Sequence, residues 1–170
     1  MNIIKVASDS HKRLRYLKRR KRTEIFMEKG YVAEREIQIL YADTDMMGVI
    51  YHGNYVKWLE LGREQLIEDI GYSYRSMESK GYYAPVYNVD ITYKKALKYG
   101  DRAFVRTWVA ENGKAKVVYG FQIIDQDGVL CTEGTTVHTV VKKVDGEFKT
   151  VNFKKAFPEW YEIYEQIKVD

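Results

Sequence analysis

The order of the expected elements is the feature that most restricts what this chain can fold into. One long helix pattern comes first, and several strand patterns follow it without a second long helix between them. Over residues 54–70, apolar side chains recur every three or four positions, which is typical of a helix with a buried face. This stripe consists of Tyr55, Trp58, Leu59, Gly62, Leu66 and Ile70. Leu61 and Ile67 widen it, so we expect a helix covered on more than one side, with Asn54 as its N-cap and Gly71 just past its end.

Four long segments rich in Val, Ile, Thr, Tyr and Phe follow this helix and are typical of strands. They span residues 83–97, 102–111, 114–126 and 129–144, and a shorter return strand is expected over 148–151. Asn112-Gly113 and Asp127-Gly128 are strong signals for tight hairpins between them. We also expect a first strand over 32–41, a short helix over 73–80 and a C-terminal helix over 158–167.

Strands joined by tight hairpins form an antiparallel sheet. We therefore predict an α+β fold, in which a sheet of five or more strands wraps round one long central helix. Such a sheet keeps an open edge, and pairing two sheets edge to edge is a common way to cover it.

Length and composition indicate one globular domain. The chain has 170 residues, of which 45% are hydrophobic and 31% are charged. No apolar run approaches the ~18 residues that a membrane span needs, and the start lacks the apolar region of a secretory signal, so we expect no membrane insertion. A single cysteine, Cys131, allows no internal disulfide, and the three histidines lack the spacing of metal ligands. We expect a cytoplasmic protein without a metal or cofactor.

The net charge of +4 is unevenly distributed along the chain. Residues 1–26 contain nine Lys or Arg and two acidic residues, so the remainder carries a net charge of about −3. We interpret 1–26 as a basic, flexible extension and 27–170 as a single folded domain. An arm that binds nucleic acid or an anionic membrane is the alternative for the extension. The mildly acidic body argues against a nucleic-acid partner for the domain itself.

The stretch from Tyr41 to Tyr55 contains the residues with acid–base chemistry. Two aspartates and a histidine lie within it, and glycines stand at positions 48 and 53. The stretch leads into the beginning of the long helix, where free backbone N–H groups can polarise a carbonyl oxygen or stabilise an oxyanion. It is therefore the candidate site.

This stretch resembles a motif of the hotdog-fold acyl-CoA thioesterases. It reads Tyr41-x-Asp43-Thr44-Asp45-x-x-Gly48-Val49-x-Tyr51-His52-x-Asn54-Tyr55 and continues as Trp58-Leu59-Glu60-x-x-Arg63. The similarity is closest to the 4-hydroxybenzoyl-CoA thioesterase family, including the Tol-Pal-associated enzymes, and covers about residues 30–150. Tyr93 with Gly100-Asp101 matches a strand junction of the same family. The resemblance implies a hotdog fold and hydrolysis of an acyl-CoA to the free acid and coenzyme A.

The resemblance also implies roles for single residues. Asp45 would be the catalytic carboxylate, acting as nucleophile or as general base for water. The backbone of His52 would supply the donor to the thioester oxygen. The His52 side chain could orient the carboxylate or the water, and Tyr41 could hydrogen-bond Asp45 or shape the pocket; a loop hydrogen bond and strand packing are the respective alternatives. The expected substrate-binding residues are Gly48, Val49, Tyr51, Gly53, Asn54 and Tyr55.

Other readings stay open from the sequence. We expect Asp43 to fix the loop through backbone N–H groups, and Glu60 is the rival carboxylate because another hotdog branch uses a helix glutamate. A cluster of basic residues near one strand junction could meet the phosphates of coenzyme A or could simply be solvated; it consists of Lys94, Lys95, Lys98 and Arg102. The alternative functions are an acyl-ACP thioesterase, a hotdog dehydratase and a non-catalytic acyl-CoA-binding module. The family implies a homodimer with the site between subunits, or a homotetramer of paired dimers.

Overall fold

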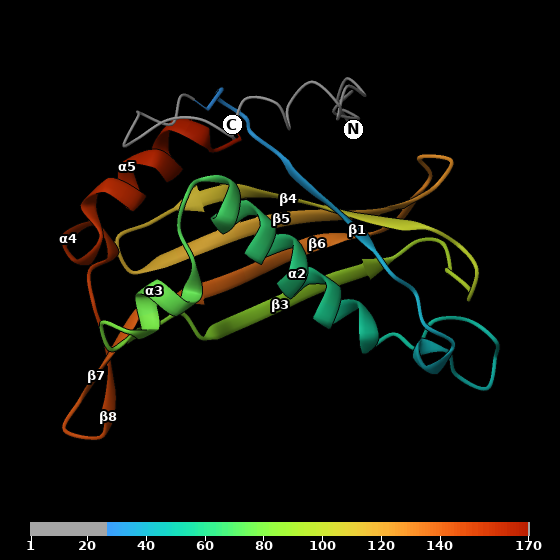
Figure 1. Cartoon of the computed structure of the whole chain (residues 1–170), viewed down its shortest axis with the longest axis horizontal. Coiled ribbons are helices and arrows are strands. Elements are labelled where there is room, and N and C mark those ends of the chain that lie inside the picture. Colours follow the sequence, from blue (N-terminus) through green and yellow to red (C-terminus); the bar gives the residue numbers. More distant parts are fainter. Residues whose placement is uncertain (1–26, 170) are drawn as a thin grey trace.

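A long helix lies across one face of an antiparallel sheet in the computed structural model, which describes residues 27–169 (Figure 1). The helix is α2 (Asn54–Asp69), and the five strands of the sheet follow the order β1-β4-β5-β6-β3. Their bounds are β1 (Ala33–Ile37), β3 (Val86–Tyr93), β4 (Ala103–Asn112), β5 (Lys116–Asp125) and β6 (Leu130–Thr139). The predicted α+β arrangement is confirmed. The predicted basic extension over 1–26 lies outside the described residues.

A second, smaller sheet was not expected. It contains β2 (Tyr82–Tyr83), β7 (Val141–Val144) and β8 (Glu147–Thr150), in the order β2-β7-β8. The single strand predicted over 129–144 is therefore wrong, because β6 ends at Thr139 and β7 joins the other sheet. Two backbone hydrogen bonds lie where the chain passes from one sheet to the other. The N–H of Thr139 donates to the carbonyl of Pro85, and the N–H of Lys143 donates to the carbonyl of Gly81.

The remaining elements of the described residues are one 3-10 helix and three α-helices. They are η1, a 3-10 helix (Tyr41–Asp43), α3 (Tyr74–Glu78), α4 (Phe153–Ala156) and α5 (Pro158–Ile167). The C-terminal helix has the predicted bounds, and the Ser73 side chain caps α3 as expected by accepting from the N–H of Ser76. The predicted first strand over 32–41 is too long, because β1 ends at Ile37 and the chain turns through η1 instead.

The core lies between α2 and the sheet, and the predicted stripe of α2 is buried there. Gly62 marks the closest approach, because a Cβ atom at this position would lie 2.4 Å from the Thr107 side-chain oxygen on β4. The N-terminal half of α2 packs with β1, β4, β5 and Leu97, whereas the C-terminal half packs against an aromatic cluster from α4 and α5. Among the described helices, none is long and apolar enough to cross a membrane.

Candidate active site

Asp45 stands in a tight turn at the end of the loop that precedes α2. Its N–H donates to the carbonyl of Val49 and the N–H of Gly48 donates back to the Asp45 carbonyl, both at 2.9 Å. Gly48 has a φ of 73°, a conformation that glycine adopts without steric cost. The Asp45 carboxylate is half-buried, and its Oδ1 accepts from the N–H of Met47 at 2.8 Å. Within the described residues its Oδ2 accepts no hydrogen bond, so this oxygen is free to act.

Asp43 fixes the loop, as expected. Its Oδ2 accepts from the N–H of Leu40 at 2.9 Å, and its backbone carbonyl accepts from the N–H of Tyr51 at 2.9 Å and from Asn54 Nδ2 at 2.8 Å. Only 7% of this residue is exposed. Its carboxylate therefore belongs to the structure of the loop and does not face the solvent beside Asp45.

The predicted N-cap of α2 is wrong by one residue. Gly53 is the N-cap, and Asn54 is the first helical residue, whose Nδ2 donates to the Asp43 carbonyl and ties the beginning of α2 to the loop. The backbone N–H of Asn54 donates to the carbonyl of Tyr51 at 2.9 Å. By contrast, the N–H groups of His52 and Gly53 donate to no acceptor among the described residues. Two unpaired donors therefore stand at the beginning of α2.

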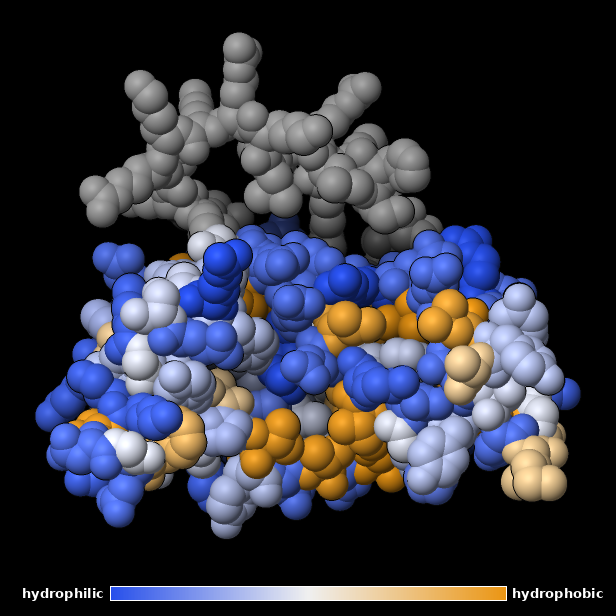
Figure 2. Space-filling view, turned by 60° about the horizontal axis from the view of Figure 1, so that its bottom comes forward, coloured by the Kyte–Doolittle hydropathy of each residue, from blue (hydrophilic) through white to orange (hydrophobic). Residues whose placement is uncertain are grey.

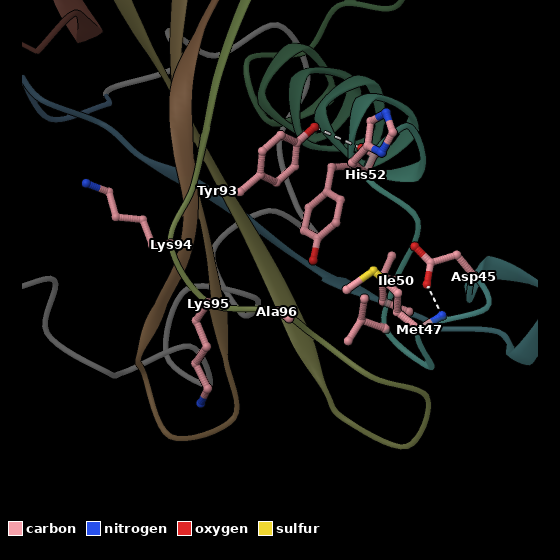
Figure 3. A pocket seen from close by; sticks show the side chains of 10 residues that line it. Asp45, Met47, Ile50, His52, Tyr93, Lys94, Lys95 and Ala96 are labelled. Atoms are coloured by element: carbon pink, nitrogen blue, oxygen red, sulfur yellow. Dashed lines mark hydrogen bonds between the residues drawn. The ribbon is translucent and has the colours of Figure 1, made fainter.

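An open cavity of about 310 Å³ joins Asp45 to the beginning of α2 (Figure 3). The loop before α2 supplies half of the residues in its wall, and the end of β3 with the segment after it supplies most of the others. The full lining consists of Asp45, Met47, Val49, Ile50, His52, Tyr55, Tyr93, Lys94, Lys95 and Ala96. Of the expected substrate-binding residues, Val49 and Tyr55 line the cavity within one chain, whereas Gly48, Tyr51, Gly53 and Asn54 do not.

The two supporting side chains named from the sequence lie away from the Asp45 carboxylate. The His52 ring is exposed and points away from Asp45, toward the rings of Tyr51 and Tyr93 at 4.3 and 6.4 Å between centroids (Figure 3). The Tyr41 side chain is 74% exposed and packs edge-on against Tyr99 at 5.6 Å, outside the cavity lining. A single chain therefore places Asp45 and His52 on one cavity, but directs neither of these two rings at the Asp45 carboxylate.

Two tyrosines form the inner wall. Tyr55 is 3% exposed, and burial raises the pKa of its hydroxyl, which accepts from the N–H of Leu97 at 3.4 Å. Burial also raises the pKa of Tyr93, whose hydroxyl donates to the carbonyl of His52 at 2.9 Å. Both phenols are therefore neutral near pH 7 and contribute no negative charge beside Asp45.

The lysines that line the cavity are both held by carboxylates. Lys94 pairs with Glu133 at 2.8 Å, and Lys95 pairs with the buried Asp125 at 2.5 Å. The hydrogen bond between Lys95 and Asp125 raises the pKa of the lysine and lowers that of the carboxyl. The rival carboxylate Glu60 is exposed on α2 and does not line the cavity. No group of three or more His, Cys, Asp or Glu within residues 27–169 could hold a metal ion.

A buried polar group was missed by sequence reasoning. Arg63 on α2 is 7% exposed; its Nη1 lies 2.9 Å from His138 Nε2, and its Nε donates to the Tyr74 hydroxyl. His138 also contacts the carbonyl of Ala84 and the hydroxyl of Thr136. The residues come from four separate segments, so no local pattern could have predicted their contact.

Comparison with known proteins identifies the class to which this fold and site belong. The chain belongs to the thioesterase-like superfamily, whose sequence pattern matches residues 39–161. The predicted thioesterase family is thereby confirmed.

The particular relatives agree with this class. A Bacillus subtilis (strain 168) protein named "Putative acyl-CoA thioesterase YneP" is 44% identical over 138 residues, which cover 81% of this chain and 99% of the relative. The structure of a DHNA-CoA thioesterase from Staphylococcus aureus has a TM-score of 0.75 and 38% identity, covering 79% of this chain and 89% of that one.

A more distant structure shows the fold alone. The 4-hydroxybenzoyl CoA thioesterase from Pseudomonas sp. strain CBS-3 is 15% identical, with a TM-score of 0.69 over 78% of this chain and 98% of that one. The predicted hotdog fold is therefore confirmed.

Proposed function

We propose that this protein is an acyl-CoA thioesterase, which hydrolyses the thioester of an acyl-CoA to the free acid and coenzyme A, with Asp45 as its catalytic carboxylate. The observation that carries the proposal is the shared cavity, which Asp45 and His52 both line, together with the N–H of His52 that has no acceptor among the described residues. The 44% identical relative and the 38% identical structure are both named as CoA thioesterases, which supports the same activity here.

The two sides of the cavity supply the two requirements of thioester hydrolysis. A thioester oxygen placed at the beginning of α2 would accept from the N–H of His52, which polarises the carbonyl and stabilises the oxyanion that forms on it. The free Oδ2 of Asp45 would then remove a proton from an attacking water, or attack the carbonyl carbon itself. In the second route the thiolate is expelled, and water hydrolyses the resulting mixed anhydride to release the acid and restore Asp45. The coenzyme A thiolate leaves readily, so this mechanism needs no strong general acid.

The acyl group would lie against an apolar and aromatic wall. Met47, Ile50, Tyr55 and Tyr93 supply this wall, and rings favour aromatic acyl groups through edge and face contacts. Because the 38% identical structure is named a DHNA-CoA thioesterase, we include aromatic acyl groups in the proposed substrate class.

We also propose that the protein acts as a homodimer joined through β3. This strand is an edge of the five-stranded sheet, and its N-terminal half carries the exposed residues Val86, Tyr87 and Val89. Figure 2, turned so that the side bearing β3 comes forward, shows apolar side chains gathered on this face. Pairing with a second β3 would satisfy its free backbone groups and cover these side chains. A homotetramer would require a further contact between dimers.

A cytoplasmic location is part of the same proposal. The only cysteine, Cys131, is buried and free, as suits a reducing compartment.

A panel of thioesters tests the proposal. Purified full-length protein is given aliphatic, benzoyl-type and naphthoyl-type acyl-CoA and the same acyl groups on acyl carrier protein, and thiol release is followed. We expect hydrolysis of at least one acyl-CoA, at a higher kcat/KM than for the matched acyl-ACP. A preference for acyl-ACP would favour the alternative carrier. Tight binding of acyl-CoA without hydrolysis would favour the non-catalytic module and overturn the proposal.

A further inference from the structure

Tyr93 joins the edge strand of the sheet to the beginning of the long helix. It is the last residue of β3, and its hydroxyl donates to the backbone carbonyl of His52 at 2.9 Å, as the dashed line in Figure 3 shows. Its ring packs edge-on against Tyr55 at 5.2 Å. The hydroxyl proton is therefore engaged with the backbone and is not available for donation to a substrate.

The carbonyl groups on both sides of His52 are held by hydrogen bonds. The carbonyl of Tyr51 accepts from the N–H of Asn54 at 2.9 Å, and the carbonyl of His52 accepts from Tyr93. A peptide unit is planar, so a bond to its carbonyl also fixes the direction of its N–H. The bond to the Tyr51 carbonyl thus orients the N–H of His52, and the bond from Tyr93 to the His52 carbonyl orients the N–H of Gly53. Neither N–H has an acceptor in the described part of the chain.

No helix cap performs this task instead. The N-cap is Gly53, which has no side chain to accept from the first turn. A side chain added at Gly53 would collide with the Tyr51 ring, since a Cβ would lie 2.6 Å from it. Restraint of the Gly53 N-cap therefore has to come from another element, and the Tyr93 hydroxyl supplies it from β3.

We propose that Tyr93 is a positioning residue for the thioester site. Its hydroxyl holds the His52 carbonyl, and through it the N–H of Gly53, which we place beside the N–H of His52 as a second donor to the oxyanion. This inference rests on the proposed function and adds to it a hydroxyl that touches neither the thioester group nor Asp45, although the ring that carries it lines the acyl wall. Its predicted effect falls on the transition state, because the oxyanion forms only after attack on the carbonyl.

The test replaces Tyr93 by phenylalanine, which removes the hydroxyl and keeps the ring against Tyr55. With the best acyl-CoA of the panel, we expect kcat to fall about 10-fold and KM to change less than about twofold, since loosening a donor costs less than deleting one. Binding of a trifluoromethyl ketone analogue, which becomes tetrahedral in the site, should weaken in proportion to kcat/KM. Binding of an unreactive thioether analogue of acyl-CoA should not change.

A matched control lies outside both the cavity and the proposed dimer edge. Tyr83 of β2 packs edge-on against Phe148 at 5.3 Å and its hydroxyl has no hydrogen-bond partner in the described residues, so Tyr83→Phe should keep wild-type kcat and KM. A second readout is the carbonyl carbon resonance of His52, which should move upfield in Tyr93→Phe when its hydrogen bond is lost.

The outcomes separate this inference from the proposed function. If the wild type hydrolyses acyl-CoA and Tyr93→Phe retains its kcat, the positioning role is wrong while the proposed function stands. Equal loss of affinity for both analogues would also overturn it, because that result indicates general damage to the site. If the wild type hydrolyses no acyl-CoA, the proposed function fails first. An unchanged His52 carbonyl resonance would then contradict the hydrogen bond itself.

Discussion

At the scale of single residues, Asp43 and Asp45 have the same side chain and lie in one loop, but they occupy different environments. The carboxylate of Asp43 turns inward and accepts from the backbone of Leu40, whereas Oδ2 of Asp45 remains free beside the cavity. The sequence alone was sufficient to propose this division, because the motif assigned chemistry to Asp45. It was not sufficient to place the side chains of Tyr41 and His52, whose directions depend on Tyr99 and Tyr93 from distant segments.

His138 should make stability depend on pH. Burial and the adjacent Arg63 charge lower the pKa of His138 from 6.5 to about 4. The unfolded state therefore binds more protons between pH 6.5 and 4, so the free energy of unfolding should fall as the pH falls through this window, by up to about 3 kcal/mol.

Urea unfolding at pH 7 and pH 4.5 measures this effect. His138→Gln keeps a hydrogen-bonding side chain but cannot titrate, so it should be less stable than the wild type at pH 7 and show a smaller loss on acidification. Equal losses in both proteins would rule out His138 as the source of the pH dependence.

At the scale of elements, periodicity predicted the helices better than the ends of the strands. The apolar stripes of the two longest described helices predicted the bounds of α2 and α5 to within one residue. Residues 129–144 have strand propensity throughout, so nothing local marks the change of sheet after Thr139, which depends on which strands lie alongside. The strand expected over 83–97 is interrupted between β2 and β3, and Pro85 could have indicated this break. Proline has no N–H to donate to a neighbouring strand.

Gly62 sets the distance between α2 and β4. Alanine is a better helix former by about 1 kcal/mol, but its Cβ would lie 2.4 Å from Thr107 Oγ1 and 2.8 Å from Val105 Cγ2. We expect Gly62→Ala to lower the free energy of unfolding by about 2 kcal/mol, because α2 must move off the sheet.

A double-mutant cycle, measured by urea unfolding, tests whether the contact with Thr107 causes this loss of stability. Thr107 Oγ1 is buried without a hydrogen-bond partner, so Thr107→Ala alone should cost little. Combined with Gly62→Ala, it should restore part of the lost stability. Additive effects of the two substitutions would show that this contact is not the source of strain.

At the scale of the whole molecule, the open edge of the sheet explains why the site should belong to a pair of chains. Four of the expected substrate-binding residues lie outside the cavity lining of a single chain. The family resemblance implies a site between subunits, and β3, which contributes Tyr93 to the cavity, is also one of the two edge strands of the five-stranded sheet. Assembly and activity should therefore be coupled through this strand.

The proposed dimer predicts the mass in solution. Light scattering should give about twice the 20.0 kDa of one chain. Val89→Asp places a second carboxylate next to Asp90 on the exposed edge, so it should shift the mass toward that of the monomer. Phe148→Asp removes an even more exposed apolar residue on β8 of the smaller sheet and should leave the dimer intact. A monomeric wild type, or equal dissociation by both variants, would contradict pairing through β3.

The most direct test of the central claim is the rate of coenzyme A release by Asp45→Asn, measured beside the wild type and Glu60→Gln. Asparagine keeps the size of the side chain but is neither a nucleophilic carboxylate nor a base. We expect kcat to fall by about 10³-fold in Asp45→Asn, with acyl-CoA binding retained, and to stay near the wild-type value in Glu60→Gln. Full activity in Asp45→Asn, with loss of activity in Glu60→Gln, would show that the carboxylate on the helix performs the chemistry instead.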